Sequence, residues 1–224
     1  MIKFLLRGLL SMLVALPLLA GAAQANNQEF VLGKDYQIIQ ATTAPATPLP
    51  AGKIQVLEFF SYGCPWCFRF EPVLEQWLKT KPKDVEFDRV PVVFEQGWDT
   101  LAKAYYTAKG LGVADKMTPV IFDALQVQGQ DLINQDNLAK LFAQNGVSES
   151  DFNSAFNFSP GIDAQMMRGE NLMGVYRVFE IPTLVIHGKY RVNMGMVKGD
   201  SDRMIQIANY LINKVRQENA KKKA

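Results

Sequence analysis

Two cysteines in a chain of 224 residues lie three positions apart, in a Cys-Pro-Trp-Cys segment at 64–67. The preceding residues, 54–60, form an apolar run typical of a buried strand, and apolar residues then recur at helical spacing through 80. Cys64 is therefore expected at a helix N-terminus, where unpaired backbone N–H groups and the helix dipole stabilise negative charge. Because the thiolate is the reactive form of cysteine, we expect a lowered pKa for Cys64, with Cys67 placed to attack a mixed disulfide.

Two other uses of the cysteine pair have to be weighed. A structural disulfide would close a very short loop, and the stabilisation that a disulfide gives grows with loop length. A structural zinc site needs four ligands, whereas the chain offers these two cysteines and one distant histidine, His187. We interpret His187 as an exposed turn residue and not as a base or ligand. A strand, a CxxC motif and a helix in this order favour a redox-active dithiol.

A carboxylate inside the predicted buried strand is the second candidate for chemistry. Glu58 shares one face of that strand with Val56 and Phe60 by period-two alternation. Burying a carboxylate is costly unless it is paired. Two interpretations stay open: a proton acceptor behind the disulfide that helps to deprotonate Cys67, or a carboxylate paired with a lysine or a backbone donor.

The N-terminus predicts an exported protein. Lys3 and Arg7 precede an uncharged segment over 8–22, and small residues follow at the cleavage positions, so 1–25 is expected to be a cleaved signal peptide rather than a membrane anchor. No later segment approaches the ~20 apolar residues of a membrane span. Without Lys3 and Arg7 the basic residues equal the 22 acidic ones, so composition predicts no general attraction to nucleic acid.

The order of predicted elements, with strands before and after a long helical block, indicates an α/β chain with an inserted all-helical subdomain. The expected first part is 26–95, the insertion 96–178, the second part 179–216 and a solvated tail 217–224. The expected strands are 36–40, 54–60, 85–93, 184–186 and 190–194, and the expected last helix is 200–215.

Several methionines form a further pattern in the second half of the chain. They could line an adaptable peptide groove, although packing in the core is the favoured interpretation. The residues are Met166, Met167, Met173, Met194 and Met196.

Taken together, these features resemble the DsbA-type thiol oxidases of the thioredoxin superfamily, over essentially the whole mature chain. The matching segments are Val56-Leu57-Glu58-Phe59-Phe60-Ser61 before the CxxC motif, Phe70-Glu71 after it, Leu111-Gly112-Val113, Asp115-Lys116, Ile181-Pro182-Thr183 and Gly188-Lys189-Tyr190.

The resemblance implies a thioredoxin-like fold, with a mixed central sheet flanked by helices, in which Cys64 is the attacking thiol and Cys67 the resolving one. It implies that the peptide bond before Pro182 is cis and faces the disulfide, where its backbone can pair with a bound peptide. It also favours Glu58 as a buried proton acceptor. It implies no bound cofactor. The implied partners are unfolded, newly exported polypeptides, which receive the disulfide, and a quinone-linked membrane protein of the DsbB type, which restores it in the periplasm.

Three residues are expected to tune the pKa and redox potential. Pro65 suits a first helical turn, because it lacks only an N–H that would go unpaired. Many DsbA-type enzymes have histidine in place of Trp66, and valine is common in place of Ile181. We therefore expect a smaller pKa depression at Cys64 than in the histidine-containing relatives. The alternatives are a disulfide isomerase or reductase on the same fold, or a peptide-binding chaperone that does not use its thiols.

Overall fold

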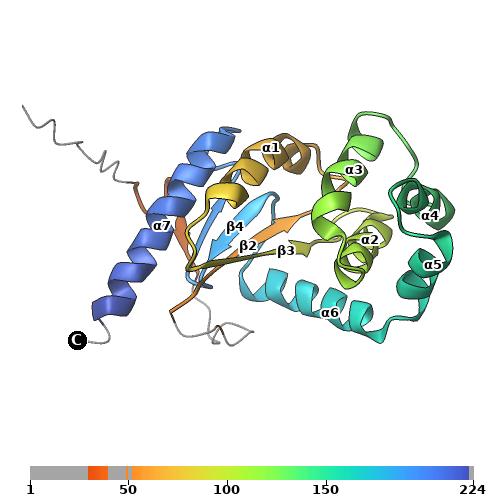
Figure 1. Ribbon diagram of the computed structural model, residues 1–224. Coiled ribbons are helices and arrows are strands. Elements are labelled where there is room, and N and C mark those ends of the chain that lie inside the picture. The colour runs from red at the N-terminus through yellow and green to blue at the C-terminus, as the bar shows by residue number, and fades with distance from the viewer. Residues whose placement is uncertain (1–29, 40–48, 50–51, 222–224) are drawn as a thin grey trace, which may run out of the picture.

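The computed structural model describes residues 30–39, 49 and 52–221, so the expected signal peptide lies outside the described residues. A five-stranded mixed sheet forms its centre, in the order β1-β5-β4-β2-β3 (Figure 1). The strands are β1 (Gln37–Ile38), β2 (Ile54–Phe60), β3 (Val85–Pro91), β4 (Thr183–Ile186) and β5 (Tyr190–Asn193). The helices are α1 (Pro65–Thr80), α2 (Trp98–Gly110), α3 (Ala114–Gln126), α4 (Gln135–Gln144), α5 (Glu149–Phe158), α6 (Pro160–Val175) and α7 (Ser201–Lys221).

Strand β2 runs through the centre of the molecule, parallel to β3 and antiparallel to β4. All seven of its residues are buried, which explains its nearly continuous apolar sequence. Its side chains alternate between two cores. Ile54 and Val56 pack with α1 and α7, whereas Leu57 and Phe59 pack with α6 on the opposite face of the sheet. The expected central strand and its flanking helices are therefore present.

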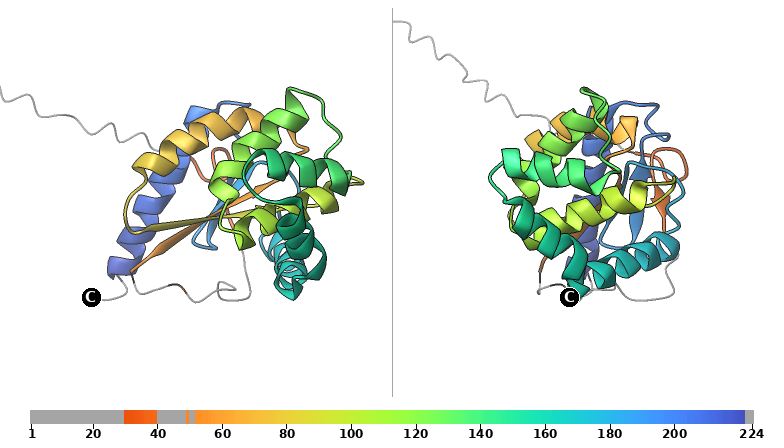
Figure 2. Two further views of the ribbon diagram at one scale, coloured as in Figure 1. Left: turned by 45° about the vertical axis from the view of Figure 1, so that its right-hand side comes forward. Right: turned by 90° about the vertical axis from the view of Figure 1, so that its right-hand side faces the viewer.

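Helices α2 to α5 form a lobe beside the sheet (Figures 1 and 2). Capping side chains start two of these helices: Asn134 accepts a hydrogen bond from the N–H of Asp136 at α4, and Ser148 from that of Asp151 at α5. The core of this lobe also takes in Cys64 and Cys67. The all-helical block expected between the strands thus packs directly on the cysteine turn.

The end of the chain differs from the sequence prediction. We expected the last helix to end at 215 and a solvated tail to begin at 217, but α7 continues to Lys221. Glu218, in the additional turns, accepts hydrogen bonds from the Lys189 ammonium and the Tyr190 hydroxyl. These partners belong to the turn after β4 and to β5, so tertiary contacts hold a segment whose local sequence resembles a tail.

Strand β3 ends at Pro91, two residues before the predicted end. It is an edge strand of the sheet, where the missing N–H of a proline is tolerated. The N–H of Val92 still donates to the carbonyl of Phe60 at 2.8 Å. The chain after β3 therefore leaves the sheet next to the end of β2, which leads into the cysteine turn.

Candidate active site

The two cysteines lie at the junction of β2 and α1, as the sequence predicts, and both are free thiols. Cys64 is the N-cap of α1, and its sulfur accepts a hydrogen bond from the backbone N–H of Cys67 at 3.3 Å. Pro65 occupies the first turn, where its missing N–H costs nothing. Cys64 is 5% exposed and Cys67 is completely buried. A reaction partner can therefore reach Cys64 but not Cys67.

The surroundings shift the pKa values of the two thiols in opposite directions. The pKa of Cys64 is lowered to about 7, chiefly by a hydrogen bond with the Cys67 side chain; burial opposes this, and the backbone N–H groups of Cys67 and Trp66 add to it. The pKa of Cys67 is raised well above its ordinary value by burial, by its interaction with Cys64 and by the charge of Glu58. At neutral pH Cys64 is therefore partly ionised, whereas Cys67 keeps its proton.

The loop before β4 lies against Cys64. The Ile181–Pro182 peptide bond is cis. The Cys64 thiol points its sulfur at the carbonyl oxygen of Ile181, 3.7 Å away. Proline brings no N–H to this position, so the loop presents a carbonyl acceptor to the sulfur and no competing donor. The structure therefore brings Ile181 and Pro182 together with a motif more than a hundred positions earlier in the sequence.

Glu58 is buried and paired, with an arginine instead of the lysine or backbone donor that we considered. Arg89 stands opposite Glu58 in the β2–β3 register, and its Nε donates to Glu58 Oε2 at 2.9 Å. The Nη2 of Arg89 also donates to both oxygens of Glu71, at 2.8 and 2.9 Å, and to Glu75 at 3.3 Å. Glu58 Oε1 is buried without a hydrogen bond. The guanidinium of Arg89 therefore pairs with three carboxylates.

This imbalance of charge affects the protonation of the cluster. Burial raises the pKa of Glu58, and burial raises that of Glu71 to about 8, in both cases against the attraction of Arg89. A buried carboxyl group with a raised pKa next to a thiol pair can hold a proton and release it. The geometry is compatible with both interpretations of Glu58, since pairing with Arg89 leaves one of its oxygens free.

Arg89 and Glu71 were missed as members of this cluster by sequence reasoning. A signal for Arg89 exists: it is a cation within an otherwise buried end of a strand that pairs in parallel with the strand of Glu58. Using that signal requires the register of β2 against β3, which local periodicity does not give.

Trp66 is 45% exposed, and its indole packs against Arg69 and Gly199. The guanidinium of Arg69 lies 4.7 Å from the ring centroid. Gly199, which has φ +84°, approaches the ring so closely that a Cβ there would lie 3.0 Å from Cζ3. Trp66 acts on the pKa of Cys64 through its backbone N–H.

The remaining candidates lie away from the cysteines. His187 follows β4 at the end of the sheet opposite the cysteine turn and is half-buried, not exposed as predicted. Its backbone N–H donates to the Gln55 carbonyl, which ties this turn to the start of β2. Within residues 30–39, 49 and 52–221, no three histidine, cysteine, aspartate or glutamate side chains gather as metal ligands. None of the helices in this described part is long and apolar enough to cross a bilayer.

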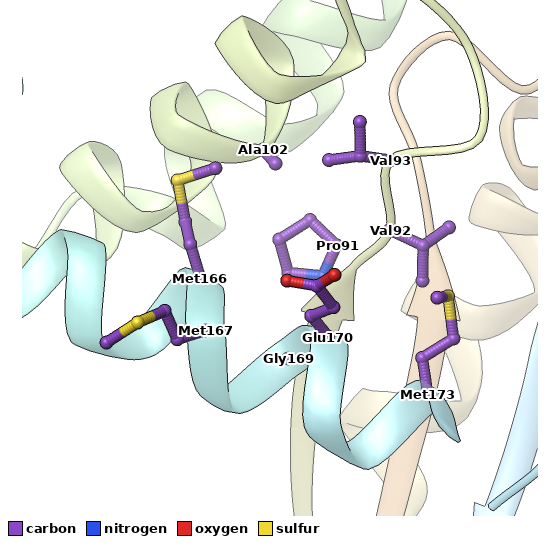
Figure 3. Close-up of a pocket in the computed structure, with 9 residues that line it drawn as sticks. All are labelled: Pro91, Val92, Val93, Ala102, Met166, Met167, Gly169, Glu170 and Met173. Carbon is purple, nitrogen blue, oxygen red and sulfur yellow. The ribbon is translucent and has the colours of Figure 1, made fainter.

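The five methionines do not form one groove. Met166, Met167 and Met173 line a cavity of about 340 Å³ between α6 and the end of β3, with the Glu170 carboxylate beside it (Figure 3). Met194 is buried in the core formed with α1 and α7. The preferred interpretation as core residues therefore holds for Met194 and in part for Met166 and Met173, which also pack against buried cores. Met167 is exposed and Met196 is half-buried.

Comparison with known proteins gives consistent matches over most of the chain. A family model described as "DSBA-like thioredoxin domain" matches residues 89–211. The thiol:disulfide interchange protein DsbA of Burkholderia cepacia is 35% identical over 181 residues, which cover 81% of this chain and 84% of that protein. The protein of the same name from Pseudomonas aeruginosa strain PAO1 is 34% identical over 208 residues, with 93% and 95% covered.

Solved structures agree with these sequence matches. The crystal structure of Pseudomonas aeruginosa DsbA superimposes with a TM-score of 0.78 at 32% identity, covering 85% of this chain and 97% of that one. The oxidoreductase DsbA from Xylella fastidiosa gives a TM-score of 0.75 at 34% identity, covering 84% and 98%.

Proposed function

Because this chain belongs to the DsbA family of thioredoxin-like thiol:disulfide oxidoreductases, we propose that it donates its Cys64–Cys67 disulfide to reduced polypeptides after their export. The observation that carries the oxidising direction is the opposite pKa shift of the two thiols. A stabilised Cys64 thiolate favours the reduced form, which makes the disulfide form the better oxidant.

The proposed reaction is two successive thiol–disulfide exchanges. A client thiolate attacks the sulfur of Cys64 in the disulfide; a client–Cys64 bond forms, and Cys67 leaves with the electron pair and takes up a proton. A second client thiolate attacks the client sulfur of this mixed disulfide, and Cys64 leaves as a thiolate. The client loses two electrons and two protons. The enzyme keeps the two electrons, with one proton on Cys67, and the other proton goes to solvent while Cys64 is a thiolate.

Glu58 and Pro182 are assigned supporting roles in this proposal. Glu58 exchanges the proton of Cys67, supported by its burial, its raised pKa and its influence on the pKa of Cys67. Pro182 holds a surface without N–H donors beside the sulfurs, supported by the contact between Ile181 and Cys64. Pro65 and Trp66 tune the potential through the first turn of α1.

The expected surroundings of the reaction follow from the N-terminal segment and the family. We propose that residues 1–25 direct the chain to the periplasm and that a DsbB-type, quinone-linked membrane protein reoxidises the Cys64–Cys67 dithiol. The clients are unfolded exported polypeptides. The helical insertion over 96–178 is proposed as a subdomain that encloses the cysteine turn, supported by the common core of α2, α3 and the two cysteines.

The test equilibrates the protein from residue 26 in glutathione buffers and measures its redox potential, followed by oxidation of a reduced client protein. A potential well above the roughly −270 mV of thioredoxin, with client oxidation lost in Cys64→Ser, is expected. A potential near that of thioredoxin would favour the isomerase or reductase alternative. Full activity of Cys64→Ser in cells would instead favour a chaperone that does not use its thiols.

A further inference from the structure

A buried amide joins the cis-proline loop to the segment after β5. The Nδ2 of Asn193 donates to Glu180 Oε1, and its Oδ1 accepts a hydrogen bond from the backbone N–H of Met196 at 2.9 Å. A carboxylate only accepts and a backbone N–H only donates, so these two partners fix the orientation of the amide. Asn193 is 5% exposed, whereas Glu180 lies on the surface.

Two further hydrogen bonds and one close contact hold the same loop. The Thr183 hydroxyl donates to the Glu180 carbonyl at 2.6 Å, and the N–H of Met194 donates to the Pro182 carbonyl at 3.2 Å. Gly195 leaves just enough room, because a Cβ at this position would lie 2.8 Å from Glu180 Oε2. The loop over 180–183 is therefore held through both its backbone and a side chain.

Ile181 lies within this loop, and its carbonyl oxygen faces the sulfur of Cys64 at 3.7 Å. In the free dithiol, this carbonyl is the acceptor for Cys64 whenever that thiol is protonated. Once Cys64 is bonded to a client sulfur it has no proton to donate, and the carbonyl becomes available to an N–H of the client backbone. A polypeptide client attached to Cys64 brings its own backbone close to the Ile181 carbonyl.

We propose that Asn193 and Glu180 are positioning residues that hold the Ile181 carbonyl in place to bind the backbone of a client polypeptide. This inference rests on the proposed function, in which the family implies that the backbone of this loop pairs with a bound peptide. It adds the two side chains that position the loop, Asn193 and Glu180. It separates two classes of substrate: a polypeptide dithiol uses the carbonyl, whereas a small dithiol without a peptide backbone, such as dithiothreitol, does not.

The test compares the rates at which the oxidised protein oxidises a dithiol peptide and dithiothreitol. N193D places a second carboxylate against Glu180 and removes the donor. E180A removes the acceptor from the exposed side, with little risk to folding. Both variants are expected to oxidise the peptide about tenfold more slowly, since small misplacements at a reacting site have effects of this size or larger. The dithiothreitol rate is expected to stay within about twofold of wild type.

A polarity swap supplies the decisive control. In N193D/E180Q the carboxylate introduced at position 193 still accepts from the N–H of Met196, and the side-chain amide introduced by E180Q now donates to it, so the peptide rate is expected to recover. E180Q alone should behave like wild type, because its amide oxygen can accept from Asn193. N209D makes the same chemical change at the side chain that accepts a hydrogen bond from Trp77, and it should leave both rates unchanged.

Three results would overturn the inference: an unchanged peptide rate in both E180A and N193D, equal slowing with peptide and dithiothreitol, or no recovery in the double variant. Failure of the proposed function has a different signature. In that case the wild-type protein itself would not oxidise the peptide, whatever stands at 180 and 193.

Discussion

The backbone N–H of Cys67 donates a hydrogen bond to the sulfur of Cys64 across the first turn of α1, at 3.3 Å. The same Cys67 supplies the side-chain hydrogen bond that lowers the pKa of Cys64 most. Cys67 itself is buried below this turn, where ionisation is opposed. The first turn of α1 thus lets Cys67 lower the pKa of Cys64.

Alkylation should therefore be confined to Cys64 in the reduced protein. The rate of modification by iodoacetamide is expected to rise with pH around a midpoint near 7, since the thiolate is the reactive form. Mass spectrometry identifies the modified residue. In C67A the hydrogen bond from the Cys67 thiol is lost, so the midpoint should move to higher pH; a midpoint that stays near 7 would contradict the role given to that thiol.

The free energy of unfolding of the reduced form, relative to that of the oxidised form, should pass through a maximum as the pH rises. The folded pKa of Cys64, about 7, lies below the unfolded value of roughly 8.5, so its stabilising effect grows as the pH rises from 7 towards 8.5 and is lost as the pH falls through 7. The pKa of Cys67 is raised, so above roughly 8.5 only the unfolded chain ionises there and stability falls again.

The measurement is urea unfolding of both redox forms from pH 6 to 10. Subtracting the oxidised form removes contributions from groups that ionise alike in both forms. A difference that declines steadily from pH 6 to 10 would show that the Cys64 thiolate is not stabilised by folding.

Replacing Trp66 by histidine should lower the pKa of Cys64 further. A histidine can be cationic, whereas Trp66 acts on the sulfur through its backbone N–H. Each unit of pKa corresponds to about 1.4 kcal/mol at neutral pH, or about 30 mV of oxidising power. W66F keeps a ring against Arg69 without a titratable group and serves as the control. An unchanged or raised pKa in W66H would refute the expectation.

Glu58→Gln should slow the step in which Cys67 gives up its proton. The amide can still accept from Arg89, but it cannot take a proton at neutral pH, and the loss of a general base typically costs on the order of 100-fold. The step is measured as resolution of a mixed disulfide between Cys64 and glutathione in a single turnover. Glu71→Gln changes a carboxyl group on the same guanidinium, and it should have a much smaller effect.

Equal slowing in the two variants would assign the effect to the charge balance around Arg89. In that case proton transfer by Glu58 would not be the cause.

Local patterns predict the elements of this fold better than the contacts between them. The periodicity of β2 and α1 and the capping residue Ser148 depend on neighbouring residues, and the structure confirms the elements they predict. The pairing of Glu58 with Arg89 depends on the register between β2 and β3, so local periodicity does not predict it. The end of α7 likewise depends on Glu218 reaching the turn after β4, which no local pattern shows.

Gly63→Ala should destabilise the protein, because the turn before Cys64 packs tightly against an indole. A Cβ at Gly63 would lie 2.3 Å from Nε1 and 2.5 Å from Cε2 of Trp98, so the ring or the turn must move. Overpacking of this kind typically costs about 1–3 kcal/mol. Gly110→Ala is the matched control: it lies at the end of α2 with no atom near its Cβ, and alanine there should stabilise by about 0.5–1 kcal/mol. Urea unfolding measures both, and wild-type stability in G63A would mean that Trp98 swings away from the turn at little cost.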